Sequence, residues 1–234
     1  MTRVAITTDR FDSASRPFRR YGLEPVPLPC IRIEPAAAEV LAEARKAAAA
    51  CDLVLITSVR TVDLLWPRGP MPSSPVAAVG ERTAAAVEAR GGRLALAGRA
   101  GLSDLVDQLA GTLEAASVVL LRAGGPSTSP DNSTYLGTAM AALRGRAGHL
   151  DEFEIYRTRP LPPGTDAVTA AAFASPSAVT GWHLSRSFDA LVVGVIGSTT
   201  RLAAAAYRPP DVVAPRPSHD ALARAMASYL ELSP

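Results

Sequence analysis

The chain has 234 residues, of which 48% are hydrophobic and only 5% aromatic, so it is long enough for two ordinary domains with cores of small aliphatic side chains. Its formal net charge is +2 with the charges dispersed, which argues against nucleic-acid binding but is compatible with an anionic small molecule. The opening residues do not resemble a signal peptide, and no apolar run approaches the ~20 residues of a membrane span. We therefore expect a soluble, cytoplasmic protein.

Strand-like and helical patterns alternate along the chain. Strands are expected at residues 4–8, 24–33, 53–56, 76–79, 94–96, 118–121, 153–156, 167–173, 191–196 and 212–213. Helices are expected at residues 12–20, 36–50, 59–65, 83–90, 102–113, 135–143, 178–184, 200–207 and 220–230, with Asp12 or Ser13 as the cap of the first and Ser103 as the cap of the fifth. The segment 124–133 is expected to be a loop. This alternation predicts an α/β fold with parallel sheets of about five strands and helices on both faces.

Three prolines mark the second expected strand. Pro25, Pro27 and Pro29 lack the backbone N–H that a ladder needs, so this strand is expected at a sheet edge or partly as a connector.

The cysteines and histidines show no metal-site spacing. Cys30 and Cys51 adjoin apolar runs and are expected to be buried free thiols. His149, His183 and His219 are scattered, so no metal site is expected.

Motifs of the first half recur in the second half at one offset. Gly197 follows Gly80 by 117 positions, and the same interval separates Thr200 from Thr83 and Ser175 from Ser58. Since 117 is half of the 234 residues, the pattern indicates a tandem duplication and a function that needs both copies.

Each repeated polar motif follows an expected strand. Ligands of parallel sheets bind beyond the carboxyl ends of the strands, where glycine allows tight turns and helix N-termini present unpaired N–H groups. Strand ends lined in this way by hydroxyl and backbone N–H groups suit a ligand with many carboxylates. The alternative is purely structural: Ser58, Thr83, Ser175 and Thr200 as helix caps, and the glycines as ordinary turns.

Few titratable groups accompany these motifs. No Ser/His/Asp or Cys/His arrangement can be identified. The cluster of Asp151, Glu152 and Glu154 is interpreted as a solvated strand face. An enzyme with so few titratable groups would act mainly by fixing the conformation of its substrate, with one weak acid at most. The titratable groups expected at these strand ends are Arg10, Glu81, Arg82, Arg122 and Tyr156.

The ordered set of motifs resembles the uroporphyrinogen-III synthase family over nearly the whole chain. The motifs are Thr57-Ser58-Val59-Arg60-Thr61-Val62, Ala78-Val79-Gly80-Glu81-Arg82-Thr83-Ala84, Glu154-Ile155-Tyr156-Arg157-Thr158, Ser175-Pro176-Ser177-Ala178-Val179 and Ile196-Gly197-Ser198-Thr199-Thr200, with Arg10 after the first strand.

The resemblance implies two flavodoxin-like α/β domains joined by two extended connectors, with an active-site cleft between them. Domain 1 would combine residues 1–36 with 158–234, and domain 2 would be the insertion 37–157. The connectors would be residues 24–35 and 154–160.

The resemblance also implies a reaction. The family cyclises the linear tetrapyrrole hydroxymethylbilane in haem biosynthesis, with loss of water and inversion of the last pyrrole ring, and it uses no cofactor or metal. A cytoplasmic monomer acting as a lyase and receiving its substrate from hydroxymethylbilane synthase is expected. Tyr156 is the expected catalytic group, against the alternative of a tyrosine packed at a hinge. The expected substrate-binding residues are Arg10, Ser58, Gly80, Thr83, Ser175, Ser177, Gly197 and Thr200.

Two positions depart from the family pattern. Residues 126–132 replace a glycine-rich turn and a helical arginine, and Ala174 stands where threonine is common. Two other functions stay open: a non-catalytic receptor or regulator for tetrapyrroles or other anions, and a structural partner of other tetrapyrrole enzymes. Both would tolerate the loss of Tyr156.

Overall fold

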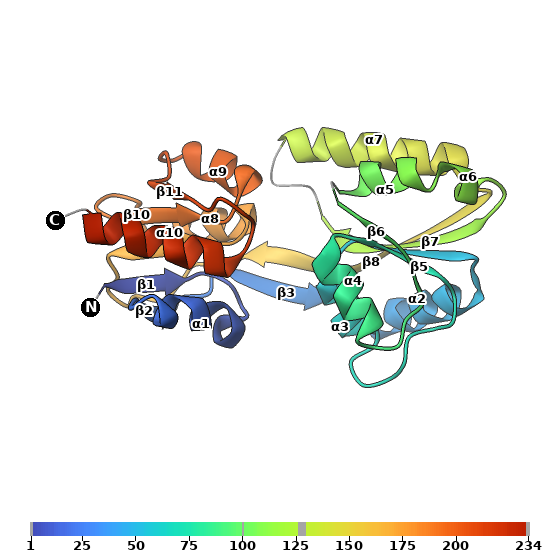
Figure 1. Ribbon diagram of the computed structural model, residues 1–234, viewed down its shortest axis with the longest axis horizontal. Helices are drawn as coiled ribbons and strands as arrows, with labels where there is room; N and C mark the ends of the chain where they lie inside the picture. The colour runs from blue at the N-terminus through green and yellow to red at the C-terminus, as the bar shows by residue number, and fades with distance from the viewer. Residues whose placement is uncertain (1, 100, 126–129, 233–234) are drawn as a thin grey trace. The chain divides into compact units, whose positions relative to one another are not determined.

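The computed structural model describes residues 2–99, 101–125 and 130–232 and divides the chain into two compact units. Unit 1 combines the chain up to Ile33 with the chain from Thr158 onward, and unit 2 is Glu34–Arg157. Each unit is a sheet with helices on both faces, as the alternating pattern predicts (Figure 1).

Unit 1 holds a five-stranded parallel sheet in the order β11-β10-β9-β1-β2. Successive residues of β1 serve opposite faces, as the strand period of two requires: Val4 and Ile6 pack under α1 and α10, while Ala5 packs under α8. The elements are β1 (Arg3–Ile6), α1 (Phe11–Arg20), β2 (Glu24–Pro27), β9 (Ala170–Phe173), α8 (Pro176–His183), β10 (Val192–Val195), α9 (Ser198–Ala205), β11 (Val212–Val213) and α10 (His219–Leu232).

Unit 2 holds a six-stranded sheet in the order β3-β8-β7-β4-β5-β6. Its central strand reads Leu53-Val54-Leu55-Ile56 and is buried throughout, which explains the uninterrupted apolar run. The elements are β3 (Ile31–Pro35), α2 (Ala38–Ala50), β4 (Leu53–Ile56), α3 (Val59–Leu65), β5 (Val76–Val79), α4 (Glu81–Glu88), β6 (Leu94–Gly98), α5 (Leu102–Gln108), α6 (Ala110–Leu113), β7 (Ser117–Gly124), α7 (Pro130–Arg146) and β8 (His149–Pro160). Helices α5, α6 and α7 share one face of this sheet (Figure 1).

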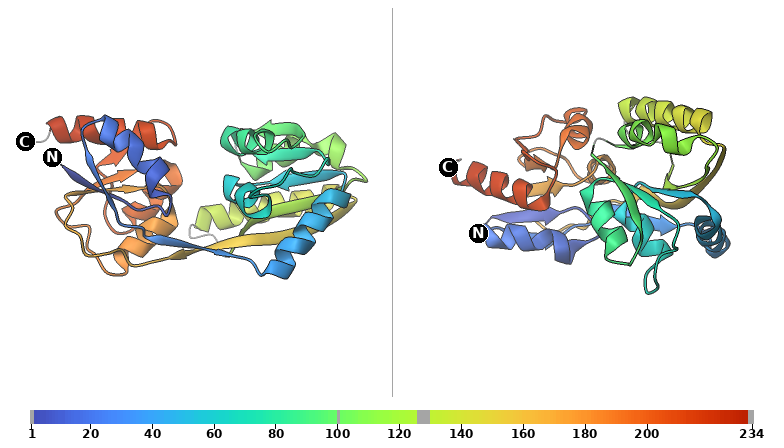
Figure 2. Two further views of the ribbon diagram at one scale, coloured as in Figure 1. Left: turned by 90° about the horizontal axis from the view of Figure 1, so that it is seen from below. Right: turned by 45° about the vertical axis from the view of Figure 1, so that its right-hand side comes forward.

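Two neighbouring segments connect the units. β3 and β8 run side by side (Figure 2), and hydrogen bonds join Ala36 N to Ile155 O at 2.9 Å and Leu161 N to Cys30 O at 2.8 Å. Because the residue numbers on one segment rise as those on the other fall, the pair is antiparallel. The single strand predicted over 24–33 is therefore wrong: β2 ends at Pro27, and β3 is an edge strand of the other sheet. The edge position predicted from the prolines is confirmed for β2.

The two sheets share one strand order. The order β8-β7-β4-β5-β6 in unit 2 corresponds to the order β2-β1-β9-β10-β11 in unit 1. Strands β4 and β9 begin at Leu53 and Ala170, which are 117 positions apart. Each unit thus joins the opening strands of one half of the chain to the closing strands of the other half.

Three local expectations are wrong. α1 begins at Phe11 without a side-chain cap, and the Ser13 hydroxyl instead donates to the Arg10 carbonyl at 3.2 Å. α5 follows Gly101, whose φ of 95° is left-handed, so Ser103 lies inside the helix. α7 begins at Pro130, a residue suited to the first helical turn, where a loop was expected up to residue 133. Residues 126–129 of the altered segment lie outside the described residues.

Within the described part of the chain, no helix is long and apolar enough to cross a membrane.

Candidate functional site

A hydrogen bond joins two of the predicted site residues in unit 2. Tyr156, on β8, is only 7% exposed, and its phenol donates to the Ser58 hydroxyl oxygen at 3.0 Å. Ser58 follows β4 in extended conformation and caps α3, because its oxygen also accepts from the Arg60 N–H at 3.1 Å. The fold therefore brings together two hydroxyls that are 98 positions apart in the chain.

Gly80 forms the turn between the next strand and its helix. It follows β5 with a φ of 82°, a left-handed conformation that favours glycine, and its N–H donates to the Gly98 carbonyl at 2.9 Å. Thr83 lies in the first turn of α4 and is 5% exposed. Gly80, not Thr83, occupies the cap position, so the interpretation of Thr83 as a side-chain cap is wrong.

An ion-pair network joins Arg122, near the carboxyl end of β7, to the middle of β8. Arg122 pairs with Glu152 at 2.5 Å and with Glu154 at 3.1 Å, and Arg157 pairs with Glu154 at 2.9 Å. The hydrogen bond from Arg157 holds the pKa of the Glu154 carboxyl below its usual value of 4.5, and the nearby Arg122 charge adds to this effect. The acidic cluster was expected to be a solvated face. For Glu152 and Glu154 this is wrong, because both are partly buried ion-pair partners.

Gly124 makes room for this network. A Cβ atom at that position would lie 2.2 Å from the Glu154 Oε2 atom, which is far inside van der Waals contact. Any side chain there would displace the carboxylate from between its two arginines.

The predicted residues of unit 1 occupy corresponding places. Ser175 follows β9 and caps α8, accepting from the Ala178 N–H at 3.3 Å, and the half-buried Ser177 lies in the first turn. Gly197 follows β10 in extended conformation, and Thr200 lies in the first turn of α9 with 2% exposure. As with Thr83, the cap position belongs to the glycine. Arg10 is exposed and immediately precedes α1.

Within each unit these residues share one sheet edge. Since β1, β9 and β10 are adjacent and parallel, Arg10, Ser175 and Gly197 all follow carboxyl ends at the same edge. In unit 2, Ser58 and Gly80 follow the adjacent parallel strands β4 and β5. We call these two edges the unit 1 rim and the unit 2 rim.

The first-turn threonines Thr83 and Thr200 do not cap their helices. Among the described residues, none forms a hydrogen bond with the side-chain hydroxyl of Thr83 or Thr200. Each threonine lies in the first turn of a helix that follows the carboxyl end of a strand, and the N–H groups of such a turn favour an anionic oxygen.

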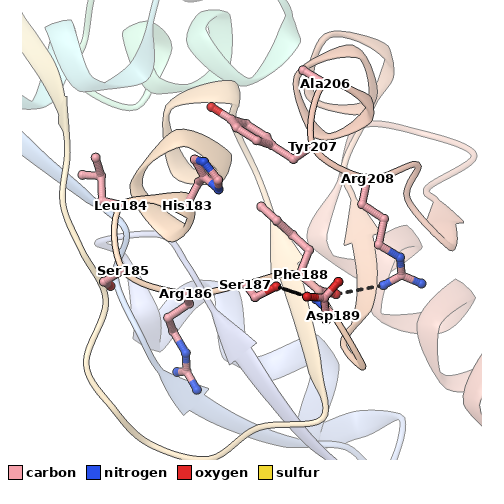
Figure 3. A pocket seen from close by; sticks show the side chains of 10 residues that line it. All are labelled: His183, Leu184, Ser185, Arg186, Ser187, Phe188, Asp189, Ala206, Tyr207 and Arg208. Carbon is pink, nitrogen blue, oxygen red and sulfur yellow. Dashed lines mark hydrogen bonds between the residues drawn. The ribbon is translucent and has the colours of Figure 1, made fainter.

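A hollow of about 750 Å³ lies elsewhere in unit 1 (Figure 3). It is lined by the segment after α8 and the residues after α9, which precede β10 and β11, so it adjoins the amino ends of these strands. The ring of His183 lies 4.1 Å from that of Tyr207, and Phe188 stacks beside Tyr207 at 5.7 Å. None of the predicted site residues lines this hollow.

Sequence reasoning missed the pairing of Glu152 and Glu154 with arginines. The alternating acidic and apolar residues of 151–156 were the available signal, but they do not reveal that β7 brings Arg122 alongside. Both cysteines are free as expected, although Cys51 is only partly buried. The described residues contain no cluster of three or more His, Cys, Asp or Glu suited to a metal ion.

The fold and the two rims define a class: an α/β protein of two similar parallel-sheet units, each with hydroxyl and amide groups along one strand-end edge. The family model described as uroporphyrinogen-III synthase HemD matches residues 12–224, so the chain belongs to this family. Family membership makes it an enzyme of tetrapyrrole biosynthesis.

Solved structures show the same fold. A mutant uroporphyrinogen III synthase from the extremely thermophilic bacterium Thermus thermophilus is 17% identical with a TM-score of 0.60, and the match covers 99% of each chain. Uroporphyrinogen-III synthetase from Helicobacter pylori 26695 is 19% identical with a TM-score of 0.64, over 97% of this chain and 99% of that chain. No curated protein sequence matches the chain.

Proposed function

We propose that this protein is a uroporphyrinogen-III synthase, a hydro-lyase that cyclises hydroxymethylbilane with loss of water and inversion of the last ring. The observation that carries this proposal is the hydrogen bond between Tyr156 and Ser58, which sets a buried phenol behind a hydroxyl at the unit 2 rim. Family membership supplies the reaction, and this pair supplies a proton donor in a site with few other candidates.

The groups at the two rims are complementary to the negative charge of the substrate. Hydroxymethylbilane carries many carboxylates, and each rim offers helix N-termini and hydroxyls that stabilise anionic oxygens. We assign substrate binding to the hydroxyls and backbone N–H groups of these rims and to the Arg10 guanidinium. The binding residues are Arg10, Ser58, Gly80, Thr83, Ser175, Ser177, Gly197 and Thr200.

Loss of the hydroxyl group begins the reaction. The pyrrole nitrogen supplies the electrons that expel the hydroxyl, and a proton must reach the departing oxygen so that it leaves as water. We assign Tyr156 as the source of that proton, a role that general acids fill with rate effects of ~10²–10⁴. Its burial against Ser58 fixes the phenol in one place.

Ring inversion depends on how the substrate is held. Closure of the resulting azafulvene at a substituted carbon gives a spiro intermediate, and fragmentation followed by reclosure inverts the ring. Because unassisted closure gives the uninverted isomer, the protein's main contribution is to fix the reacting carbons in a productive geometry. Binding of several substrate carboxylates at the rims provides that constraint.

The cellular setting is also part of the proposal. We assign the protein to the cytoplasm as a monomer that receives its substrate from hydroxymethylbilane synthase. The two free cysteines support a reducing compartment. Burial raises the pKa of the Cys30 thiol to about 12, so this thiol stays neutral and unreactive in the folded protein.

An isomer assay tests the function. Freshly generated hydroxymethylbilane is mixed with the purified protein, and the oxidised products are separated chromatographically into isomers I and III. Isomer III above the control without protein, increasing with protein concentration, supports the synthase. Isomer I alone from folded protein contradicts it and favours a non-catalytic tetrapyrrole-binding protein.

A further inference from the structure

We propose that Ser58 is a catalytic residue: its hydroxyl, not that of Tyr156, donates the proton to the departing hydroxyl of the substrate. Tyr156 stands behind it and replaces the proton that Ser58 gives away. The two side chains form a relay within unit 2. This inference rests on the proposed synthase function and goes beyond it by assigning the group that meets the substrate.

The hydrogen bonds at Ser58 are consistent with this direction of the relay. A serine hydroxyl has two acceptor positions and one donor hydrogen. The Tyr156 phenol at 3.0 Å and the Arg60 N–H at 3.1 Å occupy both acceptor positions. None of the described residues accepts a hydrogen bond from Ser58, so its own hydrogen is the one that remains to be donated outward.

The exposure of the two residues also indicates that Ser58, and not Tyr156, meets the substrate. Tyr156 is 7% exposed and belongs to the buried residues of its unit, whereas Ser58 is half-buried at the end of β4. A substrate that approaches this rim therefore meets the serine hydroxyl more readily than the phenol oxygen. The phenol lies within hydrogen-bond reach of the serine, which suits a proton supplied from behind.

The duplicated half of the chain provides an internal comparison. Ser175, 117 positions after Ser58, has the same extended conformation and caps α8 through the Ala178 N–H. Among the described residues, no side chain donates a hydrogen bond to Ser175. Capping a helix therefore does not require a buried tyrosine, and of these two serines Ser58 alone accepts a hydrogen bond from one.

The proton and electron balance closes without a cofactor. The C–O bond of the hydroxymethyl group breaks, and its electron pair leaves with the oxygen. That oxygen takes the Ser58 proton and departs as water, while the Ser58 oxygen takes the Tyr156 proton. The substrate loses its pyrrole N–H proton as the azafulvene forms, and this proton restores the phenol. The net change is the loss of one water molecule.

Four variants of the full-length protein test the relay: Ser58→Ala, Ser58→Asn, Ser58→Thr and Tyr156→Phe. Asparagine keeps a helix-capping oxygen but cannot pass a proton, and threonine keeps both functions. Ser218→Ala controls for the loss of a cap, because Ser218 accepts from the Ala221 N–H at 3.1 Å at the start of α10 and has no assigned role in the reaction. Thermal unfolding of each variant is measured beside kcat and KM for isomer III.

The relay predicts a specific pattern. Ser58→Ala and Ser58→Asn should both lower kcat by ~10²-fold or more, in the range of general acid catalysis, while KM rises by about tenfold at most, the effect of one lost binding hydrogen bond. Ser58→Thr should restore kcat to within about tenfold of the wild-type value. Ser58→Ala combined with Tyr156→Phe should be no slower than the slower single variant, since groups that act as a unit are not additive.

Other outcomes overturn the relay while leaving the synthase intact. If the wild-type protein forms isomer III but Ser58→Asn is as active as wild type, Ser58 is a cap only. If the two single losses multiply in the double variant, Tyr156 acts on the substrate directly. A wild-type protein that forms isomer I alone contradicts the proposed function itself, so the two failures are distinguishable.

Discussion

Gly181 of α8 lies against the backbone of the segment that leads from β2 to β3, and a Cβ atom at position 181 would lie 2.0 Å from the Cys30 carbonyl oxygen. The same carbonyl accepts the Leu161 N–H at 2.8 Å and so joins the two connecting segments. The absence of a side chain at one helical position thus allows this pairing to form.

Gly181→Ala should destabilise the protein because the methyl group cannot fit without moving backbone. Overpacking of this kind costs ~1–3 kcal/mol, which is measurable as a lower midpoint in urea unfolding. Gly137→Ala is the matched control: Gly137 lies inside α7 and an added Cβ would meet nothing within 4 Å. That change should raise stability by roughly 0.5–1 kcal/mol through helix propensity. Equal effects at both positions would contradict the packing argument.

Glu154→Gln should flatten the acid side of the stability profile. The pKa of Glu154 is lowered in the folded state, so its contribution is present above the unfolded value near 4.5 and is lost as pH falls through the lower folded value. The difference in unfolding free energy between wild type and variant should therefore be largest above about pH 5 and shrink toward pH 3.

Urea unfolding between pH 3 and pH 7 measures this difference. Glu43→Gln provides the comparison, because Glu43 is exposed in α2 and forms no ion pair with a described residue. A pH-independent difference at Glu154 would mean that its ion pairs with Arg122 and Arg157 do not stabilise the fold.

The sequence predicted the order of the elements better than their pairing. Apolar runs such as 53–56 and 76–79 give their strands with the observed bounds, because strands covered on both faces leave a continuous apolar signature. The split of 24–33 into β2 and β3 escaped prediction, since nothing local shows that Ile31 pairs with a strand more than a hundred residues away. Helix starts were missed for a different reason: Gly80, Gly101 and Gly197 occupy the cap positions, where side-chain caps were expected from Thr83, Ser103 and Thr200.

In the candidate site too, the residues were predictable from the sequence but their pairing was not. Ser58 and Tyr156 were each identifiable from family motifs, but their hydrogen bond depends on β4 and β8 lying two places apart in one sheet. Arg122 was counted among the groups at the rim, yet its neutralisation by Glu152 and Glu154 follows from the register of β7 against β8. Sequence patterns locate strand ends, whereas side-chain partners depend on the order of the strands.

The domain boundaries lead to a test with fragments. We propose that residues 37–157 form a separate domain inserted between residues 1–36 and 158–234, as expected from the sequence. In the structure, β3 covers the outer edge of β8, so a fragment of residues 31–160 keeps that pairing and a fragment of residues 37–157 loses it. The longer fragment should unfold cooperatively and at a higher urea concentration than the shorter one. An unfolded longer fragment would show that this unit depends on the rest of the chain.

Valine substitutions at three buried threonines distinguish a role in substrate binding from a role in packing. Thr61 is fully buried in α3 and its hydroxyl oxygen has no hydrogen-bond partner among the described residues. Thr61→Val keeps the shape and removes an unsatisfied polar atom, so it should raise the unfolding free energy by about 1 kcal/mol with unchanged turnover.

Thr83→Val and Thr200→Val should behave differently, because their hydroxyls lie at the rims and we assign them to the substrate. Each change should raise KM for hydroxymethylbilane by about threefold to tenfold, which corresponds to one neutral hydrogen bond, and should leave the urea midpoint close to that of wild type. Steady-state kinetics and urea unfolding of all three variants distinguish substrate binding from packing alone. If valine at 83 and 200 stabilises the protein and leaves KM unchanged, both threonines behave like Thr61, and the backbone N–H groups after Gly80 and Gly197 would hold the carboxylates without them.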